Sequence, residues 1–191
     1  MNKAIIIHGM MSDAKYHDTS RIDSSSNSHW LPWLQMQLCA RDILTQTPEM
    51  PRPFAPDYEA WKNVFEQFEI NEHTLLVGHS CGGGFIMRWL SDNLDRKVGK
   101  VVLVAPWLDI ERDYGSMFDF ELRADISGQS TGGIDYLYST NDGSVLKTTL
   151  QFSQKVLSDI KYHEFVDYGH FMLENMNTRE FPELLAICLG V

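Results

Sequence analysis

The chain has only three cysteines among its 191 residues, and they lie far apart, at Cys39, Cys81 and Cys188. None of them belongs to a Cys-x-x-Cys pair. This spacing argues against a disulfide framework and against a zinc site, so we expect no metal. Cys81 is best explained as a small packing residue.

Basic residues and long apolar runs are also scarce. The 16 Lys and Arg residues are outnumbered by 26 Asp and Glu residues, which gives a net charge of −10. Such an acidic chain lacks the positive surface that attracts nucleic acids and anionic membranes. No apolar run approaches the length of a membrane span, and too few residues precede the first predicted strand for a signal peptide. We therefore expect a cytoplasmic protein that binds neither nucleic acid nor membrane.

Phosphate-binding motifs are missing as well. The chain contains no Gly-x-Gly-x-x-Gly sequence, and no Lys-Ser or Lys-Thr pair follows the glycines of residues 78–84. A nucleotide site at this glycine-rich segment is therefore not expected.

The segment carries instead the pentapeptide Gly78-His79-Ser80-Cys81-Gly82, between the apolar run 75–77 and a helical pattern. Gly-x-Ser-x-Gly in a strand–turn–helix context is typical of a nucleophile elbow, which makes Ser80 the predicted nucleophile. Gly78 and Gly82 fit this reading because a Cβ at either position would collide with a neighbouring strand or helix. The simpler alternative is a glycine-rich turn without a catalytic role.

Apolar runs typical of buried strands alternate along the chain with helical patterns. We expect strands over 4–7, 75–77, 100–104, 134–138 and 162–166, and helices around 29–38, 57–68, 85–90, 146–157 and 181–189. Residues 12–28, 47–56 and 106–133 are predicted to be irregular. The alternation predicts one α/β domain over residues 1–191, with a predominantly parallel central sheet and helices on both faces.

The order of the chain also predicts the acid. In α/β-hydrolases the acid follows the nucleophile in sequence and the histidine comes last, each at the carboxyl end of a strand. The loop after strand 134–138 contains Asn141 and Asp142. We expect Asp142 to be the acid and Asn141 at most to support it, whereas Asp135 lies within the strand and should point into packing. The alternative for Asp142 is a solvated turn residue, because Asn-Asp-Gly is a common turn sequence.

The predicted base is His170, in the loop that follows the last strand. None of the other six histidines lies both downstream of Asp142 and at the carboxyl end of a strand. His79 is the second residue of the pentapeptide, and we expect it to pack sideways.

Two backbone N–H groups are expected to bind a developing oxyanion. One belongs to Cys81, the residue after the nucleophile. The other should come from the loop after the first strand, where Met10 follows Gly9. The glycine allows the backbone to approach the oxyanion closely.

With these residues in place, the chain resembles the small single-domain serine hydrolases of the YdeN type, relatives of the human retinoblastoma-binding serine hydrolase. The resemblance covers almost the whole length, and its most specific part is His29-Trp30-Leu31-Pro32-Trp33-Leu34. It implies an α/β-hydrolase fold without a large cap domain, with Ser80, Asp142 and His170 at the triad positions. The loop between Gly9 and His29 is longer than is usual in the family. The Leu-x-Cys-x-Glu sequence that binds pocket proteins is absent, so that partner is not implied.

We therefore predict a serine hydrolase, and more narrowly a carboxylesterase that acts on small short-acyl esters and needs no cofactor. An amidase, a peptidase or a thioesterase could use the same triad. A binding protein with a hydrolase fold and little turnover is an alternative of a different class. Segment 12–28 should be either disordered or a partial lid, and a groove lined by Trp107, Met117 and Phe118 would favour long acyl chains instead.

Overall fold

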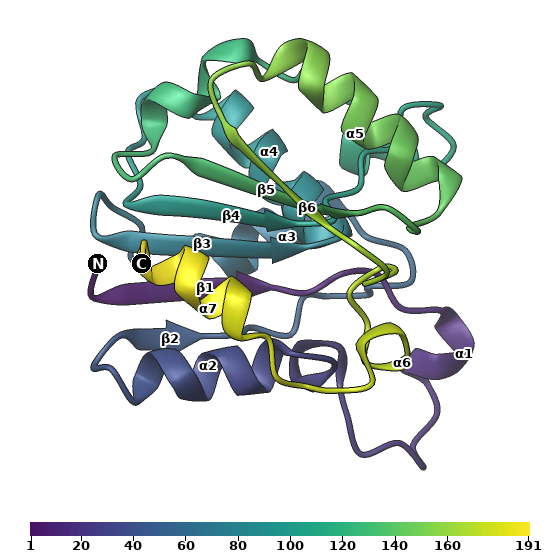
Figure 1. Ribbon diagram of the computed structural model, residues 1–191. Coiled ribbons are helices and arrows are strands. Elements are labelled where there is room, and N and C mark those ends of the chain that lie inside the picture. Colours follow the sequence, from purple (N-terminus) through teal and green to yellow (C-terminus); the bar gives the residue numbers. More distant parts are fainter.

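A computed structural model describes residues 1–191 and contains one six-stranded sheet. The strand order is β2-β1-β3-β4-β5-β6, and every neighbouring pair is parallel. The strands are β1 (Lys3–Ile7), β2 (Leu44–Gln46), β3 (Thr74–His79), β4 (Lys100–Val104), β5 (Ile134–Ser139) and β6 (Lys161–Phe165). All carboxyl ends therefore lie at one edge, and Figure 1 shows α1 (Asp13–Tyr16) and α6 (Leu173–Met176) beyond that edge.

The central strands are apolar at consecutive positions because both faces of the sheet are buried. Successive side chains of a strand point to opposite faces, so in β1 Ile5 and Ile7 join one core cluster and Ala4 and Ile6 the other. The first cluster packs against α3 (Tyr58–Phe65), α4 (Cys81–Asp92) and α5 (Ser144–Val156). The second packs against α2 (Leu31–Cys39) and α7 (Pro182–Leu189), which lie on the opposite side of the sheet in Figure 1. The predicted α/β fold is confirmed.

The start of α3 follows its sequence signal, but its end does not. Asp57 caps the helix, since its Oδ1 accepts the N–H of Ala60 at 2.9 Å. The sequence pattern predicts a helix that extends to Phe68, but α3 ends at Phe65. The N–H of Phe68 bonds the carbonyl of Phe65 at 3.2 Å in the turn that follows.

Several short elements lie in segments without a clear sequence pattern. The edge strand β2 has only three residues, too few for a recognisable alternation. Segment 12–28 contains α1 and a 3₁₀ turn, and segment 106–133 contains two further 3₁₀ turns. These connections carry no cap domain. None of the helices combines the length and the apolar content that crossing a membrane requires.

Candidate active site

Ser80 connects the end of β3 to the start of α4 in a left-handed backbone conformation, with φ 52° and ψ −121°. A non-glycine residue with such a φ is strained, at a cost of about 1–3 kcal/mol, and needs support from its surroundings. The support comes from the backbone: Ser80 N–H bonds the carbonyl of Val104 at 2.9 Å, and Ser80 C=O accepts the N–H of Trp107 at 3.0 Å. Ser80 is therefore fixed against β4 and the segment that follows it, with its side chain partly exposed.

The two glycines that flank Ser80 allow α4 to approach the sheet. A Cβ on Gly78 would lie 2.7 Å from the backbone of Gly83, within the first turn of α4. A Cβ on Gly82 would collide with the carbonyl oxygens of Ile7 and His8, at the end of β1. The turn therefore closes only with glycine at both positions.

The loop after β1 runs beside Ser80. A Cβ on Gly9 would lie 2.9 Å from the Cβ of Ser80, which brings the adjacent Met10 close to the serine. The backbone N–H of Met10 makes no hydrogen bond within the protein. Cys81 is the first residue of α4, where backbone N–H groups have no intrahelical acceptor. Two donor groups are thus free, one in each of the segments that meet at Ser80.

His8 fixes this loop from inside the protein. Its Nε2 accepts the N–H of Met50 at 2.8 Å, so Nδ1 carries the proton and donates to the carbonyl of Gly9 at 2.7 Å. The side chain is almost fully buried, and this burial lowers the pKa of His8. A neutral imidazole in one tautomer therefore holds Gly9 in place.

His170 and Asp142 meet at the same edge of the sheet, beyond β6 and β5. His170 Nδ1 lies 3.0 Å from Asp142 Oδ2. The other carboxylate oxygen of Asp142 accepts the N–H of Gly143 at 2.7 Å. Only 8% of the Asp142 side chain is exposed, whereas 20% of the His170 side chain is. The carboxylate can therefore orient the imidazole and leave Nε2 available to a second partner.

The backbone of the His170 loop is held by side chains from neighbouring segments. Asn141 Oδ1 accepts the N–H of Gly169 at 2.7 Å, and Asn175 Oδ1 accepts the N–H of His170 at 3.1 Å. Ser139 Oγ accepts the N–H of Tyr168 at 3.0 Å. Sequence reasoning gave Asn141 a supporting place but missed Asn175 and Ser139, because no local pattern indicates which distant amide a side chain will bond.

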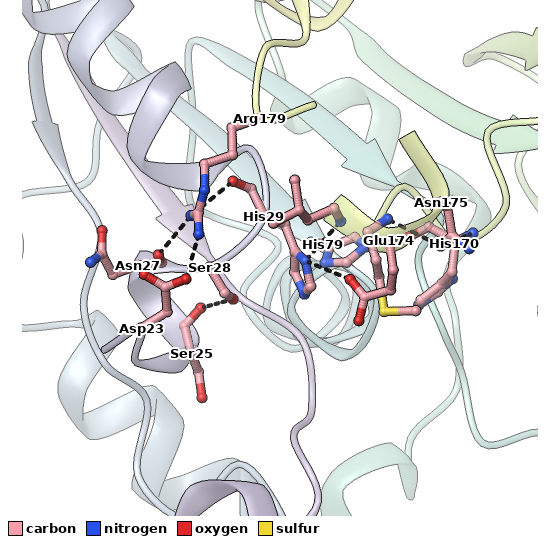
Figure 2. Close-up of polar contacts among 12 residues, drawn as sticks. Asp23, Ser25, Asn27, Ser28, His29, His79, His170, Glu174, Asn175 and Arg179 are labelled. Atoms are coloured by element: carbon pink, nitrogen blue, oxygen red, sulfur yellow. Dashed lines mark hydrogen bonds and ion pairs between the residues drawn. The ribbon is translucent and has the colours of Figure 1, made fainter. Parts of the chain in front are cut away.

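Ser80 and His170 are not joined by a direct hydrogen bond. Catalytic hydrogen bonds are often long or absent in structures without substrate. The two residues are linked through His79, whose Nε2 lies 2.9 Å from the carbonyl oxygen of His170 (Figure 2). His79 packs sideways, as expected, against Trp30 and His29.

Segment 12–28 is anchored to the chain that follows His170. Arg179 pairs with Asp23 and donates to the carbonyls of Asn27 and His29, at 3.4 and 3.5 Å (Figure 2). On its other side, the N–H of Ser26 bonds Glu49 Oε2 at 2.8 Å. The segment follows the carboxyl end of β1, at the edge of the sheet where Ser80, Asp142 and His170 lie, and these contacts attach it to Arg179 and Glu49.

A cavity of about 180 Å³ lies next to the Asp142 loop. Its walls come from residues 107–114 and from Ser144, Val145 and Thr148 in the first turns of α5. Of the three residues that the sequence suggested for a long groove, Trp107 lines this cavity, Phe118 lines a separate cavity of about 140 Å³, and Met117 is fully buried in the core. No group of three or more His, Cys, Asp or Glu side chains is arranged to hold a metal ion.

A known protein family matches most of the chain. The sequence profile of a family described as serine hydrolase matches residues 22–171. The chain belongs to this serine hydrolase family. It is also 34% identical over 85 residues to YdeN of Bacillus subtilis (strain 168), a stretch that covers 43% of this chain and 45% of YdeN. The matched stretch is thus less than half of that relative, and the predicted YdeN-type resemblance is confirmed.

Solved structures extend the similarity over the whole fold. The crystal structure of the B. subtilis ydeN gene product covers 100% of this chain, and 98% of its own, with a TM-score of 0.78 and 22% identity. A methylesterase from Arabidopsis (TM-score 0.64, 12% identity) covers 100% of this chain and 98% of its own. The ferulic acid complex of Est1E from Butyrivibrio proteoclasticus (TM-score 0.61, 14% identity) covers 100% and 87%. At these identities the similarity shows the α/β-hydrolase fold alone.

Proposed function

We propose that the protein is a carboxylesterase that hydrolyses small esters with short acyl groups. The observation that carries this proposal is the 3.0 Å contact between His170 Nδ1 and Asp142 Oδ2, at the sheet edge where the strained residue Ser80 follows β3. A serine hydroxyl is a poor nucleophile unless a histidine accepts its proton, and a carboxylate orients that histidine.

In the proposed mechanism, Ser80 Oγ attacks the ester carbonyl carbon while its proton passes to His170 Nε2. Asp142 stabilises the imidazolium that forms. The backbone N–H groups of Met10 and Cys81 donate to the oxyanion, a kind of stabilisation worth about 3–4 kcal/mol for a single donor in other hydrolases. Both groups suit this role, because neither has a partner in the fold.

The tetrahedral intermediate then collapses. The bond between the acyl carbon and the alcohol oxygen breaks, and His170 Nε2 gives its proton to the leaving oxygen. Water, deprotonated by the same imidazole, attacks the acyl group on Ser80 and releases the acid. No step in this sequence requires a cofactor.

Serine rather than the adjacent cysteine is the nucleophile in this proposal. The thiol of Cys81 is fully buried, and burial raises the pKa of Cys81 well above its usual range. A protonated, inaccessible thiol is neither nucleophilic nor open to substrate. Ser80 is partly exposed at the mouth of the same turn.

The preference for small substrates follows from the space beside the site. The cavity lined by Ser144 and Val145, which follow Asp142 closely in the chain, measures about 180 Å³, below the roughly 300–1,000 Å³ usual for drug-sized ligands. Met117 is fully buried, and Phe118 lines a second, mainly apolar cavity of only about 140 Å³, so the two residues do not form a long groove. A long acyl chain would therefore remain largely in water.

The test compares three acetyl donors with matched leaving groups: an aryl ester, an aryl amide and a thioester. The proposal predicts the highest kcat/KM for the ester. A higher value for the amide or the thioester would reassign the reaction on the same residues. Labelling by a fluorophosphonate probe without turnover of any of the three would favour the binding-protein alternative.

A further inference from the structure

His79 occupies a place in the fold that its neighbours in β3 determine. Leu75 and Val77 point into the core cluster beneath α2 and α7, and alternation along the strand sends His79 to the same face. Only 4% of His79 is exposed. A polar side chain in such a place needs a hydrogen-bond partner.

The partner is the backbone of the histidine loop. His79 Nε2 lies 2.9 Å from the carbonyl oxygen of His170. Because a carbonyl oxygen can only accept, Nε2 must carry the proton and donate. His79 thus holds His170 by its main chain, while Asp142 holds the same residue by its side chain.

This contact connects Ser80, the proposed nucleophile, to His170, the proposed base, by a short path. One peptide bond separates His79 from Ser80, and one hydrogen bond separates it from His170. The other side chains that hold the histidine loop, Ser139, Asn141 and Asn175, lie near the acid or beyond the loop. Among these contacts, His79 alone fixes the loop against the strand that carries Ser80.

The surroundings keep His79 in place and uncharged. Its ring packs edge-on against Trp30 and His29, with centroids 5.7 and 5.9 Å away. It also lies 5.1 Å from the ring of His170 (Figure 2). Burial, together with the nearby imidazoles of His170 and His29, lowers the pKa of His79 well below its ordinary value. The donor therefore stays neutral when His170 gains a proton. Packing around His79 also gives a physical reason for the His29-Trp30 sequence.

We propose that His79 is a positioning residue, which sets the place of the His170 imidazole relative to Ser80 through the His170 carbonyl. This inference rests on the proposed function, since positioning matters only if His170 serves Ser80. Small displacements of a catalytic group are costly: a shift of about 1 Å can reduce a rate about 10²-fold.

The test uses three substitutions of His79. His79→Leu removes the donor, and His79→Asn retains an amide that is too short to reach the carbonyl. His79→Gln places an N–H close to the position of Nε2. We expect His79→Leu and His79→Asn to lower kcat for p-nitrophenyl acetate between about tenfold and 100-fold, with little change in KM. In His79→Gln, kcat should lie within about threefold of the wild-type value.

His73→Leu is the matched control, because it makes the same substitution at a histidine that is 62% exposed and lies just before β3, at the end of the strand away from Ser80. Its kcat should stay near that of the wild type. The midpoint of thermal unfolding of each variant shows whether a loss of kcat comes from misplaced His170 or from a destabilised fold. If His79→Leu does not fold, His79→Asn replaces it in the comparison. Equal losses of kcat in His79→Gln and His79→Leu, or a wild-type kcat in His79→Leu, would overturn the proposal.

A second readout does not depend on substrate. His170 Nδ1 and Asp142 Oδ2 lie 3.0 Å apart, so we expect the proton between them to give a low-field NMR resonance that reports on the orientation of the imidazole. We expect it to broaden or shift in the Leu variant and to persist in the Gln variant. An unchanged resonance in Leu would refute the positioning role even if the wild-type protein hydrolysed no ester, so the failure of one proposal can be told from the failure of the other.

Discussion

Gly9 packs directly against Ser80, so closely that a Cβ on Gly9 would lie 2.9 Å from the Cβ and 3.5 Å from the Oγ of the serine. Gly9→Ala should therefore displace either Ser80 or the loop that carries Met10. We expect kcat/KM to fall about 10²-fold while the protein stays folded. Gly128→Ala is the control, since no heavy atom lies within 4 Å of a Cβ at that position. Similar kinetics for the two variants would show that the Gly9 contact is not needed.

Asp142→Asn should leave the fold intact and reduce kcat severely. An amide cannot stabilise the imidazolium of His170, and it favours the wrong tautomer, an effect of about 10⁴ on kcat when the triad aspartate of a serine protease is replaced in the same way. Asn141→Ala should lower kcat less, because it frees only the Gly169 N–H and the Ser139 hydroxyl, which donate to Asn141 Oδ1 at 2.7 and 2.8 Å. Steady-state kinetics on p-nitrophenyl acetate compares the two. Equal and mild effects would move the acid to another residue.

Substitution of Asp135 should reduce stability rather than kcat, the opposite of what is expected for Asp142. Its carboxylate is buried and lies 3.0 Å from Lys100 Nζ and 2.6 Å from His163 Nε2. Asp135→Ala leaves a buried lysine without its partner, which costs about 3–5 kcal/mol of unfolding free energy. The residue lies near the start of β5, at the far end of that strand from Asp142. We expect a large loss of stability in denaturant and a normal kcat at low temperature; a selective loss of kcat would contradict the assignment of Asp142.

His8 should make the protein less stable below neutral pH. Burial lowers the pKa of His8 in the folded state, whereas the unfolded chain takes up the proton near the ordinary value of about 6.5. The unfolded state therefore binds more protons as the pH falls below about 6.5, and folding loses free energy until the folded-state pKa is reached. His8→Gln, whose amide oxygen can accept the Met50 N–H, should lose less stability between pH 7 and pH 5. Urea titrations of both proteins measure this; parallel curves would rule out His8 as a source of the pH dependence.

The acyl-chain preference tests the size of the site. Each CH₂ that stays in water forfeits about 0.8 kcal/mol of binding, so we expect kcat/KM for p-nitrophenyl esters to be highest from acetyl to butyryl. Shortening segment 12–28, which Arg179 anchors at the rim through Asp23, should relax this preference. A wild-type kcat/KM that keeps rising through octanoate would indicate a long apolar groove.

The architecture could be predicted from the sequence because parallel buried strands leave a plain signal. Residues 101–104 form a continuous apolar run, and the structure places β4 over Lys100–Val104. The three residues of β2 gave no such signal, since their pairing with β1 depends on distant chain rather than on local alternation. The end of α3 was missed for a similar reason: Phe68 is apolar and partly buried but lies outside the helix.

Part of the candidate site could also be predicted from the sequence. Chain order singled out Asp142 and His170, and these two side chains are in contact. The supports around them could not be predicted, because His79, Asn175 and Ser139 bond backbone groups that the fold alone brings near. The functional roles of Ser80, Asp142 and His170 stay predictions until they are measured.

The most direct test of the central claim is the reaction of wild-type protein and Ser80→Ala with a fluorophosphonate probe, followed by mass mapping of the labelled peptide. Ser80 lies in the turn between β3 and α4, and the substitution removes only a hydroxyl, so the fold should persist. We predict a single label on Ser80 in the wild type, and neither labelling nor ester hydrolysis in the alanine variant. Undiminished labelling or hydrolysis in Ser80→Ala would contradict the assignment of Ser80 as the nucleophile.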